Sequence, residues 1–399
     1  MKRIIALILV LLFAFAGCST VQEKGNTTAD AETTTLPISD EKDSQSFFQG
    51  AWISYIELKK LGRSEEEYEK YIDGLFQNLK EVGTTDVFVH VRAFSDALYD
   101  SEFFPYAAYM GEGEKTDVLG LSLSMAEKYG MSIHPWINPY RAFSSSDADK
   151  SGESKIKSWV QENSPNVICV DGKYYLNPAS DEVRNIIIDG VREILTKYPT
   201  VKGIHIDDYF YPENIGDADS KDYNAYLMSG GKLSLESWRR ENVSSLISSV
   251  YSTVKSFSED KIFSISPCGS VEKNVNTLFA DVELWASQKG FCDMLIPQVY
   301  FGFENASQPF CSTVDEWARL TAESDVRLVI GLALYKCGQE DVYAGKGSKE
   351  WTEHSDIISR QVRYVREKNL DGYSLYSASF VNFSESFLSK ELDMLKSVI

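Results

Sequence analysis

Short apolar runs alternate with longer amphipathic segments from residue 48 to residue 399. Each short run is rich in β-branched and aromatic residues, which is typical of buried strands. The segment that follows has apolar residues at every third or fourth position, as in a helix that buries one face. The pattern predicts eight strands, at residues 50–56, 86–92, 131–138, 201–208, 262–267, 293–300, 326–334 and 372–376.

The first predicted helix shows how these segments are delimited. Ser64 precedes the helix and Glu67 lies three residues further on, which is the capping-box arrangement. Gly83 follows the last apolar residue and suits the left-handed turn that ends a helix. The same reasoning predicts further helices at about 119–129, 180–197, 235–254 and 387–398.

Alternating strands and helices predict a parallel sheet, because each helix carries the chain back between neighbouring strands. Eight repeats favour an α/β protein with a closed (β/α)8 TIM barrel over an open doubly wound sheet. No glycine-rich dinucleotide fingerprint follows the first strand, which further disfavours the open sheet. Residues 142–179 form the largest interruption and contain a predicted hairpin at 167–176 that turns at Asp171-Gly172.

The predicted strands agree on which of their two faces is polar. In the second strand three valines lie opposite Phe88, His90 and Arg92, and in the fourth strand two isoleucines lie opposite His205 and Asp207. A strand face that ends in a polar group suits the mouth of a barrel, where the carboxyl ends of the strands carry the chemistry. The residues expected to converge at this mouth are Arg92, Asn138, Asp207, Ser266, Gln298 and Tyr300.

Two adjacent carboxylates, Asp207 and Asp208, end the fourth predicted strand. Alternation places Asp207 on the polar face and Asp208 on the apolar side. An aspartate in this position can simply cap the next helix or loop. The cluster Tyr209-Phe210-Tyr211-Pro212 follows directly, and the combination favours a functional role for at least one of the two carboxylates.

Aromatic residues are frequent in the loops around the predicted mouth. The chain has 22 Tyr, 21 Phe and 7 Trp, so many rings must belong to the core. Rings beside carboxylates and amides suit a carbohydrate, whose C–H faces stack on rings while its hydroxyls bond to polar side chains. Cleavage of a glycosidic bond needs one carboxyl group as acid and usually a second as nucleophile or base. The candidate rings are Tyr55, Trp136, Tyr140, Tyr209, Tyr211, Phe301, Tyr335 and Tyr376.

Three of the four histidines, His90, His134 and His205, lie on the polar faces of consecutive predicted strands. Together with Asp207 they could hold a metal ion. No His-x-His or His-Glu-x-x-His spacing supports this reading. We therefore expect a layer of hydrogen-bonded interior histidines that supports the site, with no metal and no cofactor.

The charge and the first residues bear on partners and location. A formal net charge of −19 argues against nucleic acid and against a polybasic membrane patch. Residues 1–18 have a basic start, an apolar run too short to span a membrane, and small residues before Cys18. They resemble a bacterial lipoprotein signal, in which Cys18 is lipidated; a plain secretory signal is the alternative. Residues 19–46 are polar and predict a disordered tether, followed by the barrel domain at 47–399.

The five cysteines after Cys18 are odd in number and show no Cys-x-x-Cys spacing. We expect small buried residues, although one pair could form a disulfide in an exported protein. The five are Cys169, Cys268, Cys292, Cys311 and Cys337.

Several motifs occur in order along the chain. They are Val89-His90-Val91-Arg92 with Asp96-Ala97-Leu98-Tyr99, His134-Pro135-Trp136-Ile137-Asn138-Pro139-Tyr140-Arg141, Leu176-Asn177-Pro178, the stretch from Gly203 to Pro212, and Pro297-Gln298-Val299-Tyr300. Together they resemble the bacterial glycosyl-hydrolase-like family ten, whose members are exported, often lipid-anchored TIM-barrel proteins. The resemblance implies a glycoside hydrolase that acts outside the cytoplasm. For some members the implied substrate is the glycan strand of peptidoglycan, particularly strands stripped of their peptides.

The resemblance leaves the roles of single residues open. The pattern Gly203-x-His205-x-Asp207 also looks like the strand-four Gly-x-Arg-x-Asp of many retaining barrel glycosidases, in which the Asp is the nucleophile. This implies Asp207 as the first candidate for an essential carboxylate and Asp208 as its competitor. The second carboxyl group would be Asp96, Glu57 or Glu304. Alternatively the N-acetyl group of the substrate is the nucleophile, oriented by Gln298 and Tyr300, and an Asp is the acid.

The remaining candidates are assigned to substrate binding. Arg92, Asn138 and Tyr140 are expected to contact substrate hydroxyls or to tune the pKa of the catalytic Asp. Trp136, Arg141, Tyr209, Gln298 and Tyr300 complete the predicted substrate-binding set. Two other functions stay open at this point. A sugar-binding lipoprotein on an inactive barrel predicts binding without a product, and a metal-dependent hydrolase or deacetylase predicts loss of activity with a chelator.

Overall fold

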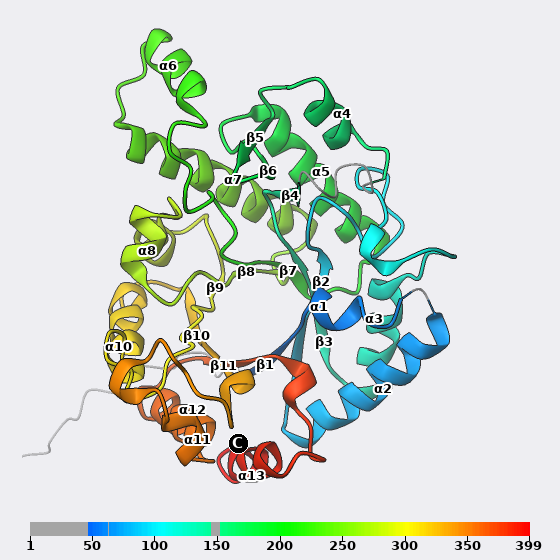
Figure 1. The fold of residues 1–399 in the computed structure, drawn as a ribbon, viewed down its shortest axis with the longest axis vertical. Coiled ribbons are helices and arrows are strands. Elements are labelled where there is room, and N and C mark those ends of the chain that lie inside the picture. The colour runs from blue at the N-terminus through cyan, green and yellow to red at the C-terminus, as the bar shows by residue number, and fades with distance from the viewer. Residues whose placement is uncertain (1–46, 63, 145–151) are drawn as a thin grey trace, which may run out of the picture. The chain divides into compact units, whose positions relative to one another are not determined.

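Eight parallel strands close into a barrel. The structure is a computed structural model and describes residues 47–62, 64–144 and 152–399. Each strand pairs with the next along the chain, and the last pairs with the first (Figure 1). The predicted TIM barrel is therefore confirmed. The strands are β1 (Phe48–Ile53), β2 (Asp86–Arg92), β3 (Ser132–Ile137), β7 (Gly203–Ile206), β8 (Ile262–Ile265), β9 (Met294–Leu295), β10 (Arg327–Leu332) and β11 (Gly372–Tyr376).

Helices surround this ring of strands, as Figure 1 shows. The long ones are α2 (Glu65–Glu81), α3 (Val118–Tyr129), α5 (Asp181–Lys197), α7 (Leu235–Phe257), α10 (Phe310–Thr321), α12 (Ile357–Glu367) and α13 (Ser386–Lys396). The shorter ones are α1 (Tyr55–Leu58), α4 (Lys155–Gln161), α6 (Ser220–Met228), α8 (Val271–Asn276), α9 (Val282–Ser287) and α11 (Glu350–Glu353). Single 3₁₀ turns lie at Ala108–Met110, Leu334–Lys336, Gly345–Gly347 and Ala378–Phe380.

The first long helix begins and ends as its sequence predicts. The Ser64 hydroxyl accepts a hydrogen bond from the backbone N–H of Glu67 at 3.2 Å, and Gly83 follows with φ +67°. Among the described residues, no helix is both long and apolar enough to cross a membrane. The proposed signal with Cys18 and the tether at 19–46 lie outside the described residues.

Strand alternation divides the core into two parts. The interior of the barrel is filled by a cluster of large residues: Phe48, Trp52, Phe88, Trp136, Met294, Ile296 and Val329. Residues of opposite parity, such as Val87, Val89 and Ile204, pack in the layer between the strands and the helices. All five described cysteines are free.

Two of the three interior histidines, His205 and His134, are hydrogen-bonded, whereas both ring nitrogens of His90 are buried without a hydrogen-bond partner. The indole N–H of Trp52 donates to Nε2 of His205 at 3.0 Å, so Nε2 carries no proton. Nδ1 of His205 then donates to the hydroxyl of Ser264 at 2.8 Å. His134 Nε2 lies 2.9 Å from the carboxylate of Asp86. The expected layer of hydrogen-bonded histidines is therefore confirmed for His205 and His134 and was wrong for His90. The described residues contain no group of three or more His, Cys, Asp or Glu side chains that could hold a metal ion.

A small antiparallel sheet interrupts the barrel repeat. It contains β4 (Arg141–Ser144), β5 (Val167–Val170) and β6 (Lys173–Leu176), in the order β4-β6-β5. The turn at Asp171 and Gly172 has φ of +50° and +70°, as in a type I′ hairpin. The predicted hairpin is confirmed, and it places β6 beside the mouth of the barrel.

Candidate active site

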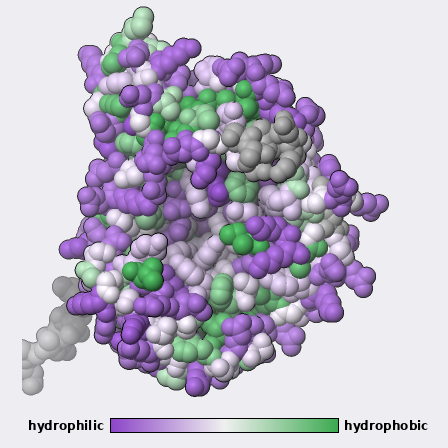
Figure 2. Space-filling model, in the orientation of Figure 1, coloured by the Kyte–Doolittle hydropathy of each residue, from purple (hydrophilic) through white to green (hydrophobic). Residues whose placement is uncertain are grey.

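Three adjoining cavities open at the carboxyl ends of the barrel strands. The mouth cavity has a volume of about 330 Å³ and lies over the barrel interior. Figure 2 shows a hollow at the centre of this face, bordered mainly by hydrophilic residues. Each of the eight barrel strands, or the segment directly after it, contributes to the lining, together with Arg141 of β4. The lining residues are Trp52, Ser54, Tyr55, Ile56, His90, Trp136, Arg141, Asp207, Asp208, Tyr209, Ser266, Gln298, Tyr300, Tyr335 and Tyr376.

Two further cavities share parts of this lining. The side cavity has a volume of about 490 Å³ and shares Tyr55 and Arg141 with the mouth cavity. The outer cavity has a volume of about 290 Å³ and shares Asp208 and Tyr209 with the mouth cavity. Volumes of this size are usual for ligand sites. The three cavities form one cleft that is much larger than a single sugar needs.

Asp207 lies at the floor of the mouth cavity, directly after β7. Its side chain is only 3% exposed. One carboxylate oxygen accepts the backbone N–H of Tyr209 at 3.3 Å, while Oδ2 is buried without a hydrogen-bond partner. Burial and the neighbouring charge of Asp208 raise the pKa of Asp207 well above its ordinary value.

Asp208 is half-buried and lines both the mouth cavity and the outer cavity. Burial raises its pKa, while the amide of Gln298 and the positive charges of Lys273 and Arg141 stabilise its ionised form. Two neighbouring carboxyl groups of this kind titrate as a unit, because the second ionisation is opposed by the first. The pair therefore keeps one proton at a higher pH than an isolated carboxyl group does.

Arg141 divides the cleft. Its guanidinium lies 4.3 Å from the ring centre of Phe94 and 4.1 Å from that of Tyr209. Stacking on two rings fixes the plane of the guanidinium and leaves its edge available for a planar anion. Arg141 is thus exposed to the mouth cavity and to the side cavity, as expected for a substrate-binding residue.

Trp136 is held in place by His90 and Asn138. Its ring stacks on His90 with ring centres 3.7 Å apart and an angle of 10° between the planes. The indole N–H donates to Oδ1 of Asn138 at 3.2 Å, and Nδ2 of Asn138 donates to the carbonyl of Ala93 at 3.2 Å. Asn138 is 1% exposed and lies outside the cavity lining. The expected contact of Asn138 with substrate was therefore wrong. Asn138 is a positioning residue that holds Trp136.

Arg92 and Tyr140 do not reach the mouth. A register shift between His90 and Arg92, where β2 pairs with β3, turns Arg92 to the outer side of the barrel. Its guanidinium lies 4.3 Å from the ring centre of Phe104, and both terminal nitrogens are buried without a hydrogen-bond partner. Tyr140 is 1% exposed and belongs to the outer core. The expected placement of both residues at the substrate was wrong.

The three candidates for a second carboxyl group also lie away from the mouth lining. Asp96 lines the side cavity, where its Oδ1 accepts the backbone N–H groups of Ala93 and Phe94, each at 3.1 Å. Glu57 is buried and bonded to the hydroxyls of Ser377 and Ser379. Glu304 is exposed. The structure thus brings together Asp207 and Asp208 and places Asp96, Glu57 and Glu304 elsewhere.

Among the predicted rings, Tyr55, Tyr335 and Tyr376 line the mouth cavity. Tyr211 and Phe301 do not. The sequence interpretation missed Trp52, which reaches the mouth from β1, and the basic and aromatic residues of the side cavity. A signal for these residues was present in the sequence. Lys173 and two tyrosines directly follow the turn residues Asp171 and Gly172, so the hairpin carries a cation and two rings.

A closed parallel barrel with an acidic pair and aromatic walls at its carboxyl-end mouth defines a glycoside hydrolase of the TIM-barrel class. The family model for glycosyl hydrolase-like 10 matches residues 48–352, and the chain belongs to this family. The resemblance inferred from the motifs is confirmed.

Curated relatives agree with this class, and a solved structure shares the fold. The chain is 30% identical over 307 residues to glycosyl hydrolase DigH of Escherichia coli (strain K12), covering 69% of this chain and 68% of that protein. It is 26% identical over 366 residues to glycosyl hydrolase YngK of Bacillus subtilis (strain 168), covering 84% and 68%. The glycoside hydrolase domain of PgaB (BpsB) from Bordetella bronchiseptica shares the fold, with a TM-score of 0.59, 9% identity and coverage of 88% and 99%.

Proposed function

We propose that this glycoside hydrolase cleaves the glycan strands of peptidoglycan at N-acetylhexosamine linkages, with Asp207 and Asp208 as its catalytic pair. The observation that carries the proposal is the pair itself, which lies at the floor of an open cleft with aromatic walls. An open cleft of three adjoining cavities suits a polymer, because several sugar units can bind on both sides of the cleaved bond.

The environments of the two carboxyl groups suggest different roles. Asp207 is the more deeply buried, so it holds the shared proton in the free site and donates it to the glycosidic oxygen. Asp208 is the ionised partner, and its carboxylate stabilises the positive charge that develops at the anomeric carbon. The bond from this carbon to the glycosidic oxygen breaks, water supplies the hydroxyl group of the new reducing end, and the proton that the water loses returns to the carboxyl pair. The strand-four analogy implies Asp207 as the nucleophile, and this assignment gives Asp207 the role of the acid instead.

The residues around the pair fit an N-acetylated sugar. Gln298 donates its amide N–H to the backbone carbonyl of Ser266 at 3.1 Å, which fixes its side chain at the wall of the cavity. Tyr300 lies beside Tyr376, with ring centres 5.6 Å apart. Together they offer a polar group and an apolar surface for an acetamido substituent, and they would orient it if the substrate assists its own cleavage.

We further propose that the protein acts outside the cytoplasm and is anchored to the membrane by a lipid on Cys18. The support is in the sequence alone: Lys2 and Arg3, the apolar run at 4–15, and the small residues before Cys18. Replacing Cys18 with Ser should release the protein from the membrane fraction. Membrane retention of that variant would contradict lipid anchoring.

The test of the substrate compares whole peptidoglycan with peptide-free glycan strands. The full chain is incubated with each, with and without a chelator, and products are identified by mass spectrometry. New reducing ends from peptide-free strands, unaffected by the chelator, are the expected result. Binding without products would favour the sugar-binding alternative, and loss of activity with the chelator would favour a metal-dependent hydrolase.

A further inference from the structure

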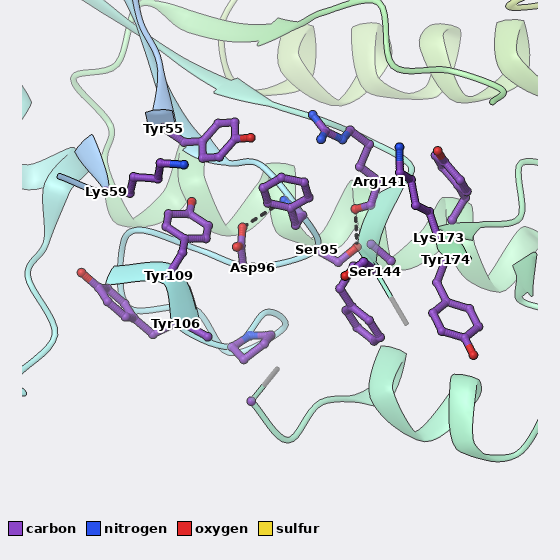
Figure 3. A pocket seen from close by; sticks show the side chains of 17 residues that line it. Tyr55, Lys59, Ser95, Asp96, Tyr106, Tyr109, Arg141, Ser144, Lys173 and Tyr174 are labelled. Atoms are coloured by element: carbon purple, nitrogen blue, oxygen red, sulfur yellow. Dashed lines mark hydrogen bonds between the residues drawn. The ribbon is translucent and has the colours of Figure 1, made fainter. Parts of the chain in front are cut away.

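The side cavity has an electrostatic character that the catalytic pair does not explain. Figure 3 shows Lys59 on one side of this cavity and Arg141 with Lys173 on the other. Among the described residues that line it, Asp96 is the one acidic side chain against these three cations. The whole chain carries a net charge of −19, so a local excess of positive charge runs against its average.

Two of the three cations contact rings: Lys59 lies over the ring of Tyr55, and Arg141 lies between two rings. Lys59, Arg141 and Lys173 form no ion pair with any described residue, although many lysines elsewhere in the described chain do. Lys59 and Lys173 are exposed, and Arg141 is half-buried between two rings. Cations that face a cavity without a carboxylate in an ion pair are available to an anionic ligand.

Aromatic rings line the same cavity. Tyr55 lies edge-on to Phe94, with ring centres 5.0 Å apart, and 5.5 Å from Tyr109. On the opposite side Phe143 and Tyr174 are 5.9 Å apart. Rings combined with unpaired cations suit a ligand that has an apolar face and a negative charge, as an acidic sugar does.

The side cavity is continuous with the catalytic cleft. Arg141 and Tyr55 line both cavities, so a glycan held at Asp207 and Asp208 can extend into the side cavity without leaving the cleft. The cations then contact a sugar unit beyond the cleaved bond. They can bind a substituent on that unit without taking part in the chemistry.

We infer that the side cavity is a subsite for a sugar unit that carries a free carboxylate, recognised by Lys59, Arg141 and Lys173. This inference rests on the proposed function and adds a basis for selectivity. In peptidoglycan the carboxylate of the lactyl ether is free only where the peptide has been removed, and a stem peptide turns it into an amide. The side cavity therefore selects peptide-free strands by charge.

The test compares oligosaccharides of equal length with the full chain. The first has free lactyl carboxylates, the second has them converted to methylamides, the third alternates N-acetylhexosamine with a uronic acid, and the fourth is neutral. The variants are the double substitution Lys59→Gln/Lys173→Gln and, as a matched control, Lys221→Gln with Lys232→Gln, two exposed lysines outside the cleft lining. Both kcat/KM and binding by calorimetry are measured, the latter with the Asp207→Asn variant.

The wild-type protein should have a higher kcat/KM for the free carboxylate than for the methylamide. In the double variant the ratio of these two values should fall about ten-fold, from about three-fold for each exposed lysine. The preference should shrink as salt is added. If the uronic acid oligosaccharide is preferred as strongly as the one with free lactyl carboxylates, the carboxylate is the recognised group. A weaker preference would assign the specificity to the lactyl ether.

Two results would overturn the inference: equal kcat/KM for acid and methylamide in the wild-type protein, or an unchanged preference in the double variant. If no oligosaccharide is cleaved, the proposed function fails, and binding decides separately on the subsite. Tighter binding of the free acid, weakened in the double variant, would then support the subsite. Equal or no binding would exclude it.

Discussion

Among single residues, Asp207 and Asp208 are the two on which the proposed chemistry depends, because they share one proton. Asp207 is buried, and its Oδ2 has no partner. Both carboxyl groups have raised pKa values, chiefly because of burial. A carboxylic acid whose pKa is raised keeps its proton to a higher pH, and this suits a general acid.

The first prediction concerns this shared proton. Replacing Asp208 with Asn removes a negative charge beside Asp207, which makes ionisation of Asp207 easier and lowers its pKa. Carbon-13 NMR titration of labelled aspartates should show this downward shift directly, without depending on activity. Asp260→Asn, at an exposed site, is the control and should leave the titration unchanged. An Asp207 pKa that stays the same in Asp208→Asn would refute the coupling.

The second prediction concerns Asp96. Burial raises its pKa from 3.8 to about 6, so the unfolded chain loses this proton at a lower pH than the folded protein does. Wild-type stability should therefore fall as pH rises from about 4 to about 6 and stay reduced above that. Below pH 4, Asp96→Asn should leave the free energy of unfolding unchanged. At pH 8 it should raise the free energy of unfolding by up to about 3 kcal/mol. Denaturant unfolding of the wild-type protein and the variant, below pH 4 and at pH 8, measures this difference. An equal change in unfolding free energy at both pH values would contradict the raised pKa of Asp96.

At the scale of elements, a bulge and a hairpin shape the site. Alternation along single strands was enough to predict that Asp207, Trp136 and Gln298 line the mouth. It failed for Arg92, because the register shift depends on how β2 pairs with β3. That pairing is a property of two strands together, and the sequence of β2 alone does not display it.

The hairpin was predictable where its parts were local. The turn at Asp171 and Gly172 follows from residue types that tolerate positive φ. That β4 joins the hairpin, and that β6 presents Lys173 and Tyr175 to the side and outer cavities, depends on tertiary packing. The side cavity was missed for this reason.

The third prediction tests the hairpin. Gly172→Val places a β-branched residue at φ +70° and should disturb the turn that positions Lys173. Cleavage of long acidic strands should fall several-fold, while the thermal unfolding of the barrel changes little. Gly290→Val is the matched control, since Gly290 also has positive φ and open space around it. Equal loss of activity in both variants would show that general backbone strain, and not the hairpin, is responsible.

At the scale of the whole molecule, barrel closure brings distant segments to one cleft. Parallel strands place all their carboxyl ends at one face, so residues from β1, β7, β9 and β11 meet although they are far apart in sequence. The repeat of eight strands and helices made this convergence predictable. The division of the cleft into three cavities was not, because it depends on loops and on Arg141 between its two rings.

The fourth prediction follows from the extent of the cleft. If a glycan fills the mouth cavity and its neighbours, kcat/KM should rise by roughly ten-fold or more from a disaccharide to longer oligosaccharides and then level off. Steady-state kinetics on a series of defined lengths would show the rise. A constant value from the disaccharide upward would indicate that only one cavity is used.

The proposed function requires that Asp207 and Asp208 cleave a glycosidic bond. The most direct measurement is the initial rate at which reducing ends are released from peptide-free glycan strands by the wild-type protein and by the Asp207→Asn, Asp208→Asn and Asp260→Asn variants. We expect the first two variants to lose about a thousand-fold and the control to lose nothing. With an activated aryl leaving group, which needs no proton, Asp207→Asn should recover most of its rate. Wild-type rates in a folded Asp207→Asn or Asp208→Asn variant would contradict the account.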